Sequence, residues 1–139
     1  MTDLGTLPGD VHSVVETINS SGQIVGRSSD ASFNGRGYVW QNGVMTDFNT
    51  LIPADSPLYV IECTSNNDLG QIVGIAVETS TGETHAFLAT PVAGAGGESA
   101  GALTEPADES LRRPNVTLPE NVRKLLHKRN RMASSQFEY

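Results

Sequence analysis

The sequence is poor in cysteine, in aromatic residues and in long apolar runs. Its 139 residues include one cysteine, Cys63, which excludes an internal disulfide and a zinc site built from several cysteines. Apolar runs of only a few residues predict no transmembrane helix. The first ten residues, MTDLGTLPGD, lack the basic and apolar regions of a signal peptide, so we expect none in this chain. Hydrophobic residues still make up 37%, which is enough for one small folded domain.

Basic residues are also scarce over most of the chain. Residues 1–92 contain ten acidic side chains but only two basic ones, Arg27 and Arg36, and residues 93–110 add four acidic side chains and no base. The other seven lysines and arginines lie in residues 111–139. An acidic body repels nucleic acids and anionic membranes, so we expect no nucleic-acid partner, and the short apolar runs predict no membrane span.

Residues 1–92 contain an internal repeat. Three pairs of segments match in order, at offsets of 44, 48 and 49 residues: Met1–Leu7 with Met45–Leu51, Gly22–Gly26 with Gly70–Gly74, and Arg36–Trp40 with His85–Ala89. Because the matches keep their order with only short slips, they predict two structural units, residues 1–44 and 45–92.

Each unit has the pattern of antiparallel strands joined by tight turns. In the first unit, β-branched residues favour a strand at Val14–Ile18, Asn19–Gly22 predicts a turn, and Asn42-Gly43 is typical of a two-residue hairpin. The other expected strands are Gln23–Ser28, Gly37–Gln41, Val44–Phe48, Leu58–Ile61, Gln71–Val77 and His85–Thr90. We therefore predict an all-β fold of two four-stranded antiparallel units like propeller blades, although the second unit reaches Pro91 before a fourth strand of its own.

The remainder of the chain has a different composition. Residues 93–117 are mostly small, polar and acidic, which predicts a flexible linker. In the basic tail, residues 118–139, Leu118–Lys128 predicts a short helix with Val122, Leu125 and Leu126 along one side. A helix of this length is marginal alone in water, and we expect residues 1–92 to fold without it.

Several motifs together resemble the bacterial HAF repeat, a family of extracellular repeats. His85-Ala86-Phe87-Leu88 matches the motif that gives the family its name, and the other matching segments are Trp40–Asp47, Met1–Gly9 and Ile18–Gly26. The resemblance covers residues 1–91, and Arg36-Gly37-Tyr38 departs from it where the family has His-Ala-Phe. It implies a propeller-like protein of the cell exterior or envelope with no established activity, and this chain looks like the C-terminal end of a repeat array.

The candidate functional residues all have a structural interpretation as well. Trp40 and Tyr38 lie on one face of a predicted strand and could stack on a sugar, but such aromatics more often belong to a core. His85 and His12 lack a third metal ligand at a suitable spacing, Asp3 and Asp47 are better explained as turn residues than as a catalytic pair, and Cys63 reads as a buried thiol. We therefore predict no catalytic residue, no cofactor and no metal, and a non-enzymatic module for binding or assembly. The alternative is a lectin-like propeller with glycan sites between blades near Trp40 and Tyr38.

The phase of the repeat suggests a partner. The predicted strand His85–Thr90 has no following strand to pair with, whereas Met1–Leu4 matches a fourth strand with nothing before it. We expect Met1–Leu4 of one chain to add to His85–Thr90 of another, and three chains would bring six units into a ring. The alternative partner is a set of further repeats upstream in a longer chain.

Overall fold

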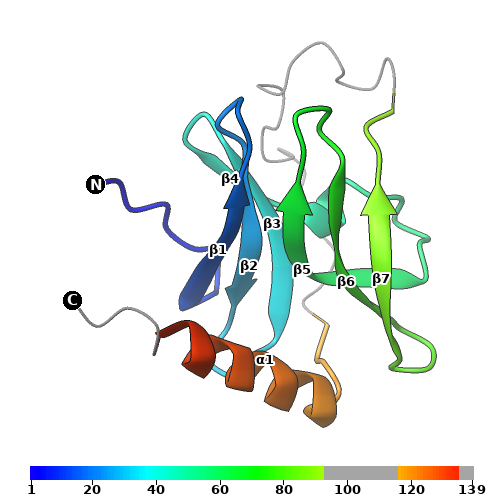
Figure 1. Cartoon of the computed structure of the whole chain (residues 1–139). Helices are drawn as coiled ribbons and strands as arrows, with labels where there is room; N and C mark the ends of the chain where they lie inside the picture. Colours follow the sequence, from blue (N-terminus) through cyan, green and yellow to red (C-terminus); the bar gives the residue numbers. More distant parts are fainter. Residues whose placement is uncertain (93–115, 135–139) are drawn as a thin grey trace.

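The computed structural model describes residues 1–92 and 116–134, which form two antiparallel sheets and one helix (Figure 1). The first sheet, in the order β1-β2-β3-β4, contains β1 (His12–Ile18), β2 (Ile24–Ser29), β3 (Gly35–Gln41) and β4 (Val44–Asp47). A 3-10 helix, η1 (Phe48–Thr50), follows β4. The second sheet, in the order β5-β6-β7, contains β5 (Leu58–Asn66), β6 (Ile72–Glu78) and β7 (Thr84–Ala89), and α1 spans Glu120–Ser134.

The prediction of a mostly β fold is confirmed; the description of both units as four-stranded is wrong for the second, whose missing fourth strand was expected from the position of Pro91. The first unit has its four strands, but the second has three among the described residues, because Pro91 follows β7 where the first unit has the Asn42-Gly43 hairpin. That hairpin has the predicted left-handed geometry, with φ of 51° at Asn42 and 86° at Gly43. Over the described ranges the two sheets close into neither a barrel nor a propeller.

The internal repeat is visible in the backbone. Both units carry an irregularity at the same place in the first strand pair, between Val15 and Thr17 in one and between Cys63 and Ser65 in the other. The turns that follow are also alike: Asn19 Oδ1 accepts the backbone N–H groups of Ser21 and Gln23, at 3.1 and 3.0 Å.

In the second unit, Asn67 Oδ1 accepts the N–H groups of Leu69 and Gln71, both at 3.0 Å. Gly22 and Gly70 close the two turns with φ of 79° and 76°, as glycine permits without strain. The asparagine and the glycine of each turn therefore determine the same local structure 48 residues apart.

The main core lies between the two sheets. Val25 and Val39, which face each other on β2 and β3, are buried against Val60 and Cys63 of β5. Beyond β4, the Phe48 ring stacks on Phe87 of β7 at a centroid distance of 5.7 Å. The segment after the fourth strand of the first unit thus covers the second unit.

Met1–Leu4 pairs with no described strand of its own chain, and its expected addition to another chain stays a prediction. Residues 1–11 lie outside the sheets, and Leu4 and Leu7 pack on Ile24 and Tyr38 of the first sheet. Leu7 is 1% exposed, and its backbone N–H donates to Ser28 Oγ at 3.0 Å. Apolar side chains at these two positions therefore cover the face of the first sheet that the second unit leaves open.

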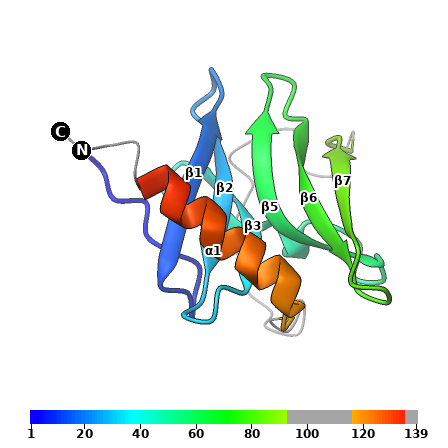
Figure 2. The ribbon, with the colours of Figure 1, turned by 60° about the horizontal axis from the view of Figure 1, so that its bottom comes forward.

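The C-terminal helix is longer than Leu118–Lys128 and is packed against the β body (Figure 2). Leu118, Val122 and Leu126 are each 1% exposed, and they contact a cluster formed by Tyr59, Ile61 and Val77. This finding removes the basis for expecting residues 1–92 to be independent of the tail. The predicted linker lies outside the described residues except for Val116 and Thr117, and no described helix is long and apolar enough to cross a membrane.

Candidate functional site

Trp40 and Tyr38, the candidate glycan-binding pair, lie in different environments. Tyr38 is fully buried, its hydroxyl donates to the Val14 carbonyl at 3.1 Å, and burial raises its pKa to about 12. Trp40 is only partly buried, beside Leu4 and Met45. Of this pair, Trp40 alone has a surface that a ligand could contact.

The acidic residues at matching repeat positions have the predicted structural role. Asp3 Oδ1 accepts the backbone N–H of Gly5, and Asp47 Oδ1 accepts that of Asn49, both at 2.9 Å. The second oxygen of Asp47 is paired with Arg36 at 3.1 Å. Both carboxylates therefore hold the chain segment that follows them.

Cys63 is buried, as predicted, and is 0% exposed. Burial raises the pKa of its thiol well above the usual range, so the reactive thiolate is not formed at neutral pH. Its place beside Val25 and Val39 makes it a packing residue between the sheets.

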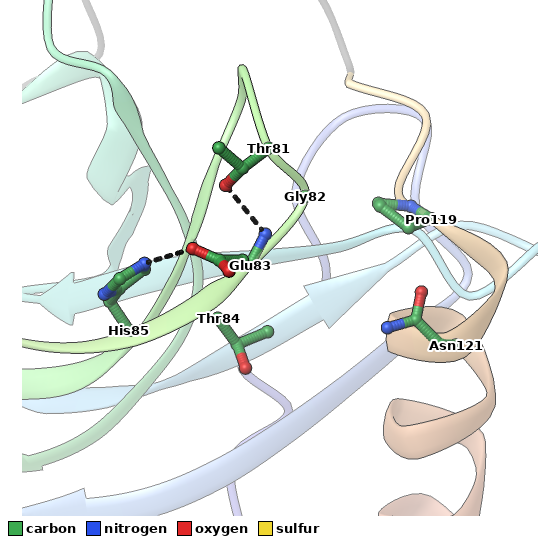
Figure 3. Close-up of a pocket in the computed structure, with 7 residues that line it drawn as sticks. All are labelled: Thr81, Gly82, Glu83, Thr84, His85, Pro119 and Asn121. Carbon is green, nitrogen blue, oxygen red and sulfur yellow. Dashed lines mark hydrogen bonds and ion pairs between the residues drawn. The ribbon is translucent and has the colours of Figure 1, made fainter.

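The β6–β7 hairpin carries a polar cluster that the sequence analysis missed. His85 Nε2 lies 3.8 Å from an oxygen of Glu78 and 3.8 Å from an oxygen of Glu83. Figure 3 shows His85 and Glu83 beside a pocket that Pro119 and Asn121 line from the other side. Within the part of the chain described, Glu78, Glu83 and His85 form the group whose donor atoms are close enough to share one metal ion.

The ordinary role of this cluster is to stabilise the hairpin. Ser80 Oγ donates to Glu78 Oε1 at 2.8 Å, and Thr81 Oγ1 lies 3.5 Å from Glu78 Oε2. The side chains of Glu78, Glu83 and His85 are 32%, 70% and 47% exposed, so water already solvates them. The second histidine of the predicted pair, His12, instead stacks on Phe33, whose ring meets His127 of α1 edge-on at 4.5 Å.

A buried ionic group connects both sheets to α1. Glu62 of β5 is fully buried, with one carboxylate oxygen 3.0 Å from Arg27 of β2 and 3.1 Å from Arg129 of α1. Burial raises the pKa of Glu62 to about 7; Arg27 opposes this shift, and Glu16 adds to it. Arg27 and Arg36 are the only lysines or arginines in residues 1–92, and both are buried in ion pairs. Because the rest of this segment carries no lysine or arginine, the sequence could have identified these two as structural residues that pair with buried acids.

The two units meet through a polar ladder at their turns. Thr17 Oγ1 donates to Asn66 Oδ1 at 2.6 Å, and Asn19 Nδ2 donates to the Asn67 carbonyl at 3.0 Å. The backbone N–H of Ser20 donates to Asp68 Oδ1 at 2.9 Å. Asn19 with Asn67 and Ser20 with Asp68 are equivalent residues at the 48-residue offset, so successive units bind each other at matching positions, as in proteins built from stacked repeats.

Among the described residues, the outer face of the second sheet exposes the apolar pair Val73 and Leu88. Val73 and Leu88 are cross-strand partners on β6 and β7, at the repeat positions of Val25 and Val39. Val25 and Val39 are 0% and 1% exposed at the junction between the sheets, whereas Val73 and Leu88 are 39% and 64% exposed. This pair and the β7 edge form the candidate interaction surface.

No family model, curated protein or solved structure matches this chain.

Proposed function

We propose that this chain is a non-enzymatic repeat module that acts by binding or assembly. The observation that carries the proposal is the contrast between two equivalent pairs: Val25 and Val39 are buried by a neighbouring unit, whereas Val73 and Leu88 are exposed. The fold covers this apolar pair in the first unit and leaves it exposed in the second. We therefore expect a further repeat unit to bind at the exposed pair.

The environments of the candidate catalytic residues support a non-enzymatic role. Asp47 is committed to a turn and to Arg36, and the thiol of Cys63 is buried with a raised pKa. Each of these groups contributes to packing or to backbone hydrogen bonding, which is the role expected in a scaffold rather than in an active site.

We extend the proposal to the architecture and location of the protein. The β1-β2-β3-β4 order of the first sheet and the stacked turns support blade-like units in a propeller-like array. The resemblance of residues 1–91 to the HAF repeat supports an exported bacterial protein, with this chain at the C-terminal end of the array. Upstream repeats in a longer chain, or other copies of this chain, would complete it.

Self-association of the full chain tests this function. Light scattering coupled to size-exclusion chromatography should give a molar mass that rises above 14.8 kDa between about 1 and 100 μM. Leu88→Lys should abolish the rise, whereas Leu51→Lys, at a leucine that is 43% exposed elsewhere on the surface, should not. A mass of 14.8 kDa at every concentration, or equal effects of both substitutions, would contradict the proposal.

Glycan binding remains the second candidate function because Trp40 is partly exposed. A glycan array probed with the full chain and with Trp40→Ala distinguishes the two functions. Reproducible binding that the substitution abolishes would favour the lectin-like function over assembly.

A further inference from the structure

Two incomplete elements of this chain fit each other. Among the described residues, β7 pairs with β6 on one edge only, and residues 1–3 are exposed and pair with no strand. We propose that the free edge of β7 binds residues 1–3 of a second copy of this chain as an added antiparallel strand. This inference rests on the proposed assembly function and specifies its partner and its site.

The first unit provides the template for this contact. In the β3–β4 hairpin, Trp40 faces Met45, Val39 faces Thr46 and Tyr38 faces Asp47. The repeat offsets convert these pairs into Ala89 with Met1, Leu88 with Thr2, and Phe87 with Asp3. The segment Met1-Thr2-Asp3 repeats the sequence Met45-Thr46-Asp47, so it carries the same side chains into the same register.

The residues that follow this segment are already placed as the template requires. After β4, Phe48 leaves the first sheet and packs on Phe87 of the second unit. Leu4, the repeat equivalent of Phe48, packs in the cluster of Tyr38, which is the equivalent of Phe87. Residues 4–7 therefore cover the first unit of this chain, as the residues after β4 cover the second unit. Residues 1–3 precede them in the chain, in the position that β4 occupies before Phe48.

The ion pair of the template has a polar equivalent at the two surfaces. In the first unit, Asp47 is paired with Arg36 at 3.1 Å. The equivalents of this pair are Asp3 and His85, so strand addition brings the Asp3 carboxylate of one copy toward the His85 imidazole of the other, which already lies 3.8 Å from Glu78 and from Glu83. Leu88 lies three residues after His85 on β7 and is exposed. In the added strand it would be opposite Thr2.

A second copy is the partner because one chain cannot bring its own two surfaces together. Figures 1 and 2 both place residue 1 and β7 on opposite sides of the molecule. A contact between opposite sides is head-to-tail, and it forms a closed ring when the rotation between copies allows. Three copies would bring together six units, which lies within the usual range of propellers.

Mixing two cysteine variants of the full chain tests the register directly. Thr2→Cys in one chain and Leu88→Cys in another should form a mixed disulfide on mild oxidation, because facing residues of antiparallel strands lie about 4.5–5.5 Å apart. Thr84→Cys, at the other end of the same strand, is the matched control and should cross-link to Thr2→Cys at least tenfold more slowly. Cys63 is buried and should not contribute.

The outcomes separate this inference from the proposed function. A mixed disulfide at Leu88 supports strand addition, and deleting residues 1–3 should then return the molar mass to that of one chain. If the parent self-associates but the truncated chain does so equally, assembly stands and this site is wrong. Rapid disulfide formation between two Leu88→Cys chains would instead show a symmetric contact and overturn the head-to-tail arrangement. A parent chain that stays monomeric contradicts both.

Discussion

Leu126 gives the sharpest test of whether α1 belongs to the cooperative structure. Its side chain is 1% exposed and packs in the cluster formed with Tyr59, Ile61 and Val77. A Cβ added to Gly35 would lie 2.8 Å from Leu126 Cδ1, so the leucine also reaches the start of β3 in the first sheet. Leu126→Ala should therefore destabilise both sheets, although the substituted residue is in the tail.

The expected loss can be bounded from the structure. Replacing a buried leucine with alanine costs about 2–5 kcal/mol, but the cost cannot exceed what docking of the helix contributes. We expect a decrease of about 2–3 kcal/mol in the free energy of unfolding, which corresponds to roughly 6–12 °C in the melting temperature of a chain of this size.

Urea unfolding monitored by Trp40 fluorescence measures this effect. Trp40 is the only tryptophan and lies in β3, so its signal reports on the first sheet and not on α1 itself. The matched control is Leu125→Ala, which makes the same substitution at a position that is 43% exposed and should cost less than about 1 kcal/mol. Equal effects of the two substitutions, or a Trp40 transition that Leu126→Ala leaves unchanged, would refute the role assigned to α1.

Two further predictions concern a turn and the buried carboxyl group. Gly43 has φ of 86° with nothing within 4 Å of an added Cβ, so Gly43→Val should cost about 1–3 kcal/mol from backbone strain alone, and Gly43→Asn should cost less in the same thermal melts. Because burial raises the pKa of Glu62 to about 7, the folded state holds the proton more tightly, and stability should fall as the pH rises from about 4.5 to 7. Glu62→Gln should match the parent near pH 5 and exceed its stability at pH 8; parallel pH profiles of the two proteins would show that Glu62 does not titrate in this range.

The strands and turns were predictable because their signals are local. Asn42-Gly43 and Asn19–Gly22 determine their own backbone geometry, and the structure shows the left-handed glycines where they were expected. The end of β4 at Asp47 was missed by one residue, because the Asp47 side chain caps η1 and draws Phe48 out of the strand.

Features that depend on distant contacts were not predictable in this way. The apolar stripe of the tail was recognised, but only its burial against Tyr59 and Ile61 distinguishes Leu126 from Leu125. The cluster around His85 was missed because Glu78 and Glu83 come together only when the hairpin closes. In each case the sequence shows which residues are available, and packing selects those that meet.

The position of α1 limits how a further unit can bind. Alternate residues of β6 share a face, so Val77, which the helix buries, lies on the same face as the exposed Val73. A partner cannot cover this whole face as the second unit covers the first, because α1 already occupies the Val77 end. The β7 edge and the Val73 end remain open, so a further unit can stack on this face only at the Val73 end, while its first segment adds along the β7 strand. Residues 1–3 of a second copy are such a segment.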